Sequence, residues 1–136
     1  MISNLSRVQS LRLFGLLSLL IYIACLSTRQ LHLLTSLNII TCVVLNALIW
    51  FIIPISLLNF IPISRLLFLD CAYIGAFIAL DVSLQEPYIL IIAAMLASSI
   101  YLLSNHYLVG LGGRLGTQAF MTCCLLIGLH SCLYLI

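Results

Sequence analysis

The stretch RLLFLDCAYIGAFIALDVSL, Arg65 to Leu84, is the segment from which the fold can be read. Most of its residues are apolar, and it has about the 20 residues that a helix needs to cross the hydrocarbon core of a bilayer. It nevertheless carries Asp70 in its first half. An ionisable side chain in a membrane span costs about 2.5–3.5 kcal/mol on insertion scales, so it indicates a functional role or a specific partner.

The composition of the whole chain agrees with a membrane location for this stretch. Of the 136 residues, 65% are hydrophobic and only 6% are charged. A soluble domain of this size has too much surface for so large a share of apolar residues to be buried. The net charge of +2 is too small to indicate nucleic-acid binding. The sequence therefore predicts one all-α membrane domain, residues 1–136, surrounded by lipid.

Apolar runs on both sides of this stretch predict four more membrane helices. Pro54 should kink or end the second helix, and Glu86 followed by Pro87 suits the start of the fourth. The first run resembles a signal peptide, but no clear small-x-small cleavage site follows it, so we interpret it as a span. The five expected transmembrane helices, joined by short loops, cover about residues 11–28, 36–59, 65–84, 87–104 and 115–136.

The arginines predict the orientation of this five-span topology. Arg7, Arg12, Arg65 and Arg114 fall on one side of the membrane, and Arg29 falls on the other. Positive residues are enriched on the side from which a membrane protein is inserted. The N-terminus is therefore expected on the cytoplasmic or mitochondrial-matrix side.

Catalytic and metal-binding patterns are not evident in the sequence. His32, His106 and His130 are spread across the expected membrane thickness, so none has an evident partner for nucleophilic catalysis or for haem ligation. The six cysteines form no C-x-x-C pair. We therefore expect no catalytic residue and no metal site in this chain.

Asp70 and its charged neighbours are the first candidate site. Arg65 precedes Asp70 by about one and a half turns, and Asp81 follows it at i+11, on roughly the same helix face. These three residues are candidates for a proton or ion path. The alternative is structural: Asp70 pairs with Arg65 or is capped by a partner subunit.

The segment YIGAF, Tyr73 to Phe77, resembles a Tyr-(Val/Ile/Leu)-Gly-(Ala/Gly) segment in one membrane family. That family is chain 6 of NADH:ubiquinone oxidoreductase, a small membrane-arm subunit of respiratory complex I. The family has five spans, with this segment in the third. The resemblance extends loosely over residues 36–136. NAL at 46–48 is similar to a pair of an asparagine and a small residue in the second span of the family. The signature before the last span is matched by Leu111, Gly112, Leu115 and Thr117.

The resemblance implies a specific role for the third helix. It would carry a π-bulge that switches to an α form, formed here by Tyr73, Ile74, Gly75, Ala76 and Phe77. This chain would bind no cofactor, while the complex would use FMN, iron–sulfur clusters and ubiquinone. Its partners would be other membrane-arm subunits and lipids, in the mitochondrial inner membrane with the N-terminus in the matrix. The switch would help to couple quinone reduction to proton translocation.

Other interpretations of the same residues stay open. Gly75 and Ala79 form a G-x-x-x-A pair that close helix packing alone would explain. The stretch around Asp70 also resembles the third helix of MARVEL-like tetraspan structural proteins, and SLRLFG at 10–15 is similar to the arginine helix of the ATP synthase proton-channel subunit. An accessory subunit of another mitochondrial complex is a further alternative.

Overall fold

The structure is a computed structural model that describes residues 7–52, 65–80, 86–104 and 114–134. Within these ranges the chain forms five α-helices and no strand, which confirms the expected all-α class. The helices are α1 (Arg7–Thr35), α2 (Ile39–Ile52), α4 (Arg65–Ile78), α5 (Pro87–Ser104) and α6 (Arg114–Tyr134).

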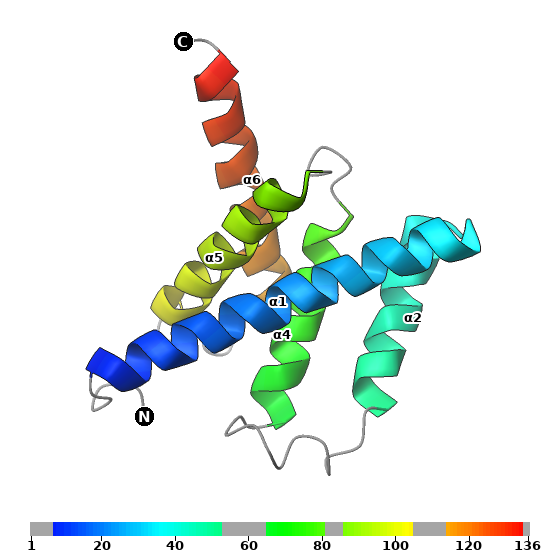
Figure 1. Cartoon of the computed structure of the whole chain (residues 1–136), viewed down its shortest axis with the longest axis horizontal. Coiled ribbons are helices and arrows are strands. Elements are labelled where there is room, and N and C mark those ends of the chain that lie inside the picture. Colours follow the sequence, from blue (N-terminus) through cyan, green and yellow to red (C-terminus); the bar gives the residue numbers. More distant parts are fainter. Residues whose placement is uncertain (1–6, 53–64, 81–85, 105–113, 135–136) are drawn as a thin grey trace.

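Helices α1 and α4 form the centre of the structure. α1 contacts α2, α4 and α5, and α4 also contacts α2 and α6. Figure 1 shows α1 running across α4, with α2 and α6 on opposite sides of α4 in this view. α5 lies beside α1 and also contacts α6. As a result, α4 is covered by α1 on one face and flanked by a helix on each side.

Helix α1 is longer than the expected span of residues 11–28, because Arg12 and Arg29 lie inside the helix and do not end it. Arginine and leucine both favour the helical conformation, so the helical backbone hydrogen bonds continue to Thr35. The helix ends after Thr35, because Ser36 has a positive φ of 52°, and the amide of Ser36 donates to the carbonyl of His32 at 3.0 Å. This left-handed residue is a common way to end a helix.

The other helix bounds follow local signals in the sequence. The side chain of Asn38 accepts a hydrogen bond from the amide of Ile40 at 3.2 Å, so α2 begins at Ile39 and not at residue 36. α5 covers residues 87–104, as expected, and the carbonyl of Glu86 accepts from the amides of Ile89 and Leu90. Residues 53–64 and 81–85, at the expected ends of the second and third spans, lie outside the described ranges.

Two of the described helices are long and apolar enough to cross a membrane: α5, and α1 from Gln9 to Thr35. The apolar parts of the others are shorter: Ile39–Ile52, Leu66–Ile78 and Leu115–Gly128. At 1.5 Å per residue, the 14 residues of α2 span about 21 Å, less than the about 30 Å of a hydrocarbon core.

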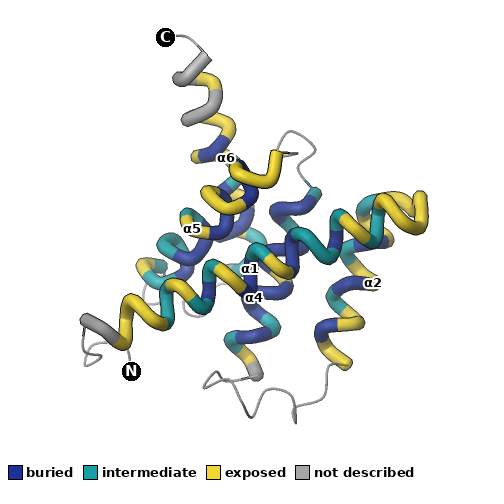
Figure 2. Tube along the Cα trace, in the orientation of Figure 1, coloured by how far each residue is buried: buried dark blue, intermediate teal, exposed yellow. Residues whose placement is uncertain are grey.

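The core lies where α1 crosses α4 and α5. Figure 2 shows buried residues in the middle of α1 and exposed ones at both of its ends. Small side chains recur in this core, among them Ala24, Ala72, Ala93 and Ala97, each at most 3% exposed. Small residues let helix backbones approach closely, which is the usual way that helices pack in membranes.

Candidate functional site

The third apolar segment, now α4, presents two different faces, and the switch residues expected from the sequence are divided between them. One face lies against α1, and the other opens toward α2 and α6. Ile74, Gly75 and Ala76 are buried, whereas Tyr73 is exposed and Phe77 is partly buried.

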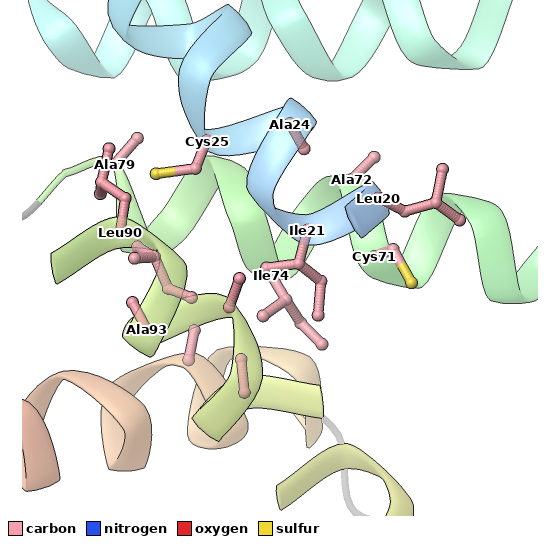
Figure 3. Packing of buried hydrophobic residues seen from close by; sticks show 14 of the residues in the cluster. Leu20, Ile21, Ala24, Cys25, Cys71, Ala72, Ile74, Ala79, Leu90 and Ala93 are labelled. Carbon is pink, nitrogen blue, oxygen red and sulfur yellow. The ribbon is translucent and has the colours of Figure 1, made fainter. Parts of the chain in front are cut away.

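Gly75 makes the closest approach between α4 and α1. A Cβ atom on Gly75 would lie 2.5 Å from the carbonyl oxygen of Ile21 and 2.7 Å from the Cβ of Ala24. Real Cβ atoms do not approach a backbone oxygen this closely, so only glycine fits without a shift of α1. Figure 3 shows Ile21, Ala24 and Cys25 of α1 facing the α4 segment that includes Ile74. Close packing of α4 against α1 therefore explains why position 75 is a glycine.

The opposite face of α4 borders an apolar groove, which we call the α2–α4 groove. Tyr73 and Phe77 stack on this face, with ring centroids 4.6 Å apart. The groove has a volume of about 460 Å³ and is lined by six residues of α2, from Ile40 to Phe51. Three residues of α4, Tyr73, Ala76 and Phe77, line the other side, together with Leu80 just beyond the end of α4. A second apolar groove, of about 400 Å³, lies between α4 and α6 and shares Phe77 and Leu80 with the first.

Asp70 is buried, and its carboxylate accepts a hydrogen bond from the hydroxyl of Tyr101 at 2.8 Å. Asp70 is 9% exposed and Tyr101 is 4% exposed. This bond joins α4 to α5 and gives a buried carboxylate one of the partners that it needs. Of the two charged residues grouped with Asp70 in the sequence, Asp81 lies outside the described ranges, as does the side chain of Arg65.

A second buried polar contact joins α2 to α1. The side-chain amide of Asn46 donates to the hydroxyl of Thr28 at 2.8 Å and to the carbonyl of Ala24 at 3.2 Å. The hydroxyl of Thr28 also donates to the carbonyl of Ala24, at 2.9 Å. Near the other end of α2, Trp50 packs on Phe68 with ring centroids 4.8 Å apart. These polar and aromatic contacts attach α2 to α1 and α4, with the groove between α2 and α4.

Two further polar contacts involve α5. The hydroxyls of Ser18 in α1 and Ser98 in α5 lie 2.9 Å apart. Gln118 of α6 is fully buried, and its amide nitrogen donates to the hydroxyl of Ser104 in α5. Every helix of the described chain is therefore tied to another by at least one buried or partly buried side-chain hydrogen bond.

The described backbone at the proposed switch is regular α-helix. All of Arg65–Ile78 is α-helical, and the amide of Ala79 donates to the carbonyl of Gly75 in the i to i−4 pattern. This conformation contains no i to i−5 bond there, so a π form would be a second state. Of the four residues in the signature before the last span, Leu115 and Thr117 lie in the first turns of α6, and Leu111 and Gly112 lie outside the described residues.

The sequence did not identify four residues that form hydrogen bonds between helices: Tyr101, Thr28, Ser98 and Gln118. Each is a polar residue inside an apolar run, and buried polar residues commonly join helices in membranes. That signal could have identified these residues, although it could not have paired them.

The arrangement offers packing surfaces and hydrogen bonds rather than reacting groups. Among the described residues, no group of three His, Cys, Asp or Glu side chains lies close enough together to hold a metal ion. The described cysteines are free thiols. The Nδ1–H of His32 donates a hydrogen bond to the carbonyl of Leu37 at 2.6 Å at the α1–α2 turn, far along the chain from Asp70.

Comparison with known proteins adds no assignment: no family model, no curated protein and no solved structure matches this chain.

Proposed function

We propose that this chain is an integral membrane protein whose five helices cross the bilayer and that it acts as a non-catalytic subunit, packing against other membrane proteins. One observation carries the proposal: large apolar side chains are exposed on every described helix, while several polar side chains are buried between the helices. Large hydrophobic side chains are exposed on all five helices, such as Leu103 at 73% and Phe120 at 68%. A monomer in water rarely exposes so much apolar surface.

The buried polar side chains support the same proposal. Asn46, Asp70 and Gln118 are each less than 10% exposed, and each bonds to a side chain of another helix. In lipid, polar groups face the interior of a bundle and pair with one another. The short α2 and α4 fit this location only if residues outside the described ranges extend their spans or if the bilayer adapts to them.

As the specific assembly, we propose the membrane arm of respiratory complex I, with this chain in the place of chain 6 in the mitochondrial inner membrane and its N-terminus in the matrix. The support is the resemblance around Tyr73–Phe77 and the division of that segment between a closed and an open face. A slip of one residue would turn Tyr73 and Phe77 within the groove. It would also move Gly75 away from α1, so α1 would have to shift in the same step.

The membrane location and the assembly are tested by two separate measurements on the full chain expressed with a small epitope tag. Alkaline carbonate extraction should leave the chain in the membrane pellet. After mild solubilisation with digitonin, native electrophoresis should show it migrating with a megadalton assembly that has NADH dehydrogenase activity. Release by carbonate contradicts the membrane proposal. Migration as a small particle contradicts complex I and favours a MARVEL-like tetraspan scaffold.

The coupling role has its own test, in Gly75→Val. If the segment switches, quinone-linked proton pumping should fall more than the amount of assembled complex, because the β-branched side chain blocks one of the two states. If pumping and assembly fall together, Gly75 serves packing alone. Gly128→Val is the matched control, since nothing lies within 4 Å of a Cβ at that position.

A further inference from the structure

We infer that the α2–α4 groove binds one acyl chain of a membrane phospholipid, with the headgroup beside the α1–α2 turn. This inference rests on the proposed membrane location. It adds a defined lipid site to a surface that would otherwise be in contact with freely exchanging lipid.

The chemistry of the lining excludes a polar occupant. All ten lining residues are apolar or aromatic, and the hydroxyl of Tyr73 is the only side-chain polar group among them. A peptide segment without its own helical bonds, or a headgroup, would leave its polar groups unsatisfied there, at a cost of about 2–7 kcal/mol for each group. A hydrocarbon chain has no such groups to satisfy.

The size of the groove favours a chain over a helix. Its volume of about 460 Å³ lies in the range of about 300–1,000 Å³ that is typical of small-molecule pockets. A helix with its side chains is about 10–12 Å across and would lie across the open side of the groove, whereas a single hydrocarbon chain is narrow enough to lie inside it. The groove is bordered by Ile40–Phe51 on one side and Tyr73–Leu80 on the other, which gives it an elongated shape.

The ends of the groove differ in polarity, as the ends of a lipid do. Trp50 packs on Phe68, so α2 and α4 run in opposite directions, and Ile40 lies at the same end as Leu80. That end adjoins the α1–α2 turn, where Ser36 and Asn38 are exposed. A headgroup at this turn meets polar groups, while its acyl chain extends toward the aromatic contact at the far end.

Native mass spectrometry tests this site on the full chain, reconstituted in phosphatidylcholine vesicles and extracted in mild detergent. We expect one phosphatidylcholine to be retained by each chain. The matched variants are Leu48→Ser and Ile49→Ser: the two side chains are adjacent on α2 and 51% and 50% exposed, but only Leu48 lines the groove. Leu48→Ser should lower retention at least fivefold, and Ile49→Ser should leave it unchanged.

A second pair of variants fills space instead of changing polarity. Ala47 lines the groove and Thr41 does not, so Ala47→Phe should displace the lipid while Thr41→Phe keeps it. Circular dichroism checks that each variant keeps its helix content. The inference is overturned if no lipid is retained, if both members of a pair behave alike, or if Ala47→Phe instead dissociates a dimer. A chain that stays in the membrane pellet but retains no lipid contradicts this site alone and leaves the proposed function intact.

Discussion

The two faces of α4 contact their neighbouring helices in opposite ways: one packs closely against α1, and the other leaves a groove next to α2. Toward α1, Gly75 brings backbone to backbone, and a Cβ atom there would lie 2.5 Å from the carbonyl oxygen of Ile21. Toward α2, the two helices leave a groove of about 460 Å³ between them and are joined outside it. The first contact depends on the absence of a side chain. The second leaves space that side chains of α2 and α4 do not fill.

This difference indicates which helix pair is held rigidly. A close-packed interface resists added volume, because its atoms already interdigitate at crystal-like density. A grooved interface can gain or lose a side chain with little change in its surroundings. We therefore expect substitutions at the α1–α4 contact to lower the free energy of unfolding most. Substitutions that remove a single interhelical hydrogen bond should have a smaller effect, and removal of one of two paired hydroxyls should have the smallest.

Gly75→Val should have the largest effect. The new side chain collides with the backbone of α1, which cannot rotate away as a side chain could, so we expect a loss of about 3 kcal/mol in the free energy of unfolding. The measurement is reversible unfolding in mixed micelles with increasing SDS. Gly128→Val introduces the same side chain in α6, where it meets nothing within 4 Å.

The difference between these two variants is the informative quantity. A large loss for Gly75→Val with a small one for Gly128→Val supports a closed α1–α4 face. Equal losses would mean that valine acts through helix propensity alone, and the contrast between the two faces of α4 would then be lost.

Tyr101→Phe should have the second largest effect. It removes the hydroxyl that donates to the Asp70 carboxylate at 2.8 Å and leaves the ring in place. Loss of one bond to a buried acidic group should lower the free energy of unfolding by about 1–2 kcal/mol. Tyr88→Phe, at an exposed position near the start of α5, is the control and should lose almost nothing. If the two variants are equally stable, the Asp70–Tyr101 bond contributes nothing to the α4–α5 contact.

Asn46→Leu should lower the free energy of unfolding by about 1 kcal/mol, mainly by weakening the contact between α2 and α1. The substitution removes the bonds to Thr28 and to the carbonyl of Ala24, while Thr28 keeps its own bond to that carbonyl. A double-mutant cycle with Thr28→Val measures the Asn46–Thr28 part separately. Strictly additive losses would contradict a direct bond between these two side chains.

The helices could be predicted from the sequence because apolar runs and turn residues are local signals. Glu86 and Pro87 mark the start of α5, and the observed helix begins at Pro87. Arg29 gave a misleading signal, since a charge marks where lipid contact ends but does not end a helix. Pro54 and its neighbours lie outside the described residues, so the kink expected there stays a prediction.

The partners in the candidate site could not be predicted in the same way. Asp70 bonds to Tyr101, 31 residues away on another helix, whereas helical spacing relates only residues on the same helix. Likewise, G-x-x-x-A indicated that Gly75 could pack closely, but not that its neighbour is α1. Which helix faces which depends on the whole arrangement, and neither composition nor periodicity contains that information.

Ser18→Ala should have the smallest effect, although the contact that it removes, at 2.9 Å, appears as good as the others. Each of the two hydroxyls also lies within hydrogen-bond distance of a carbonyl on its own helix: Ser18 at 2.9 Å from that of Phe14, and Ser98 at 2.6 Å from that of Ala94. Two hydroxyl protons serve three contacts, so one contact always lacks a proton. Removing Ser18 lets Ser98 donate to Ala94 without competition, and we expect a loss of about 0.5 kcal/mol or less.

The same unfolding assay checks this value, with Ser99→Ala as the control at the next position of α5, which is more open and where the hydroxyl donates to the carbonyl of Met95 on its own helix. A loss above about 1 kcal/mol for Ser18→Ala, with none for Ser99→Ala, would mean that the hydroxyl pair itself holds α1 to α5. In that case polar bonds, and not the small residues around Gly75 and Ala93, would set the strength of the closed side of the bundle. The contrast between the two faces of α4 would then need a different explanation from the one given by packing.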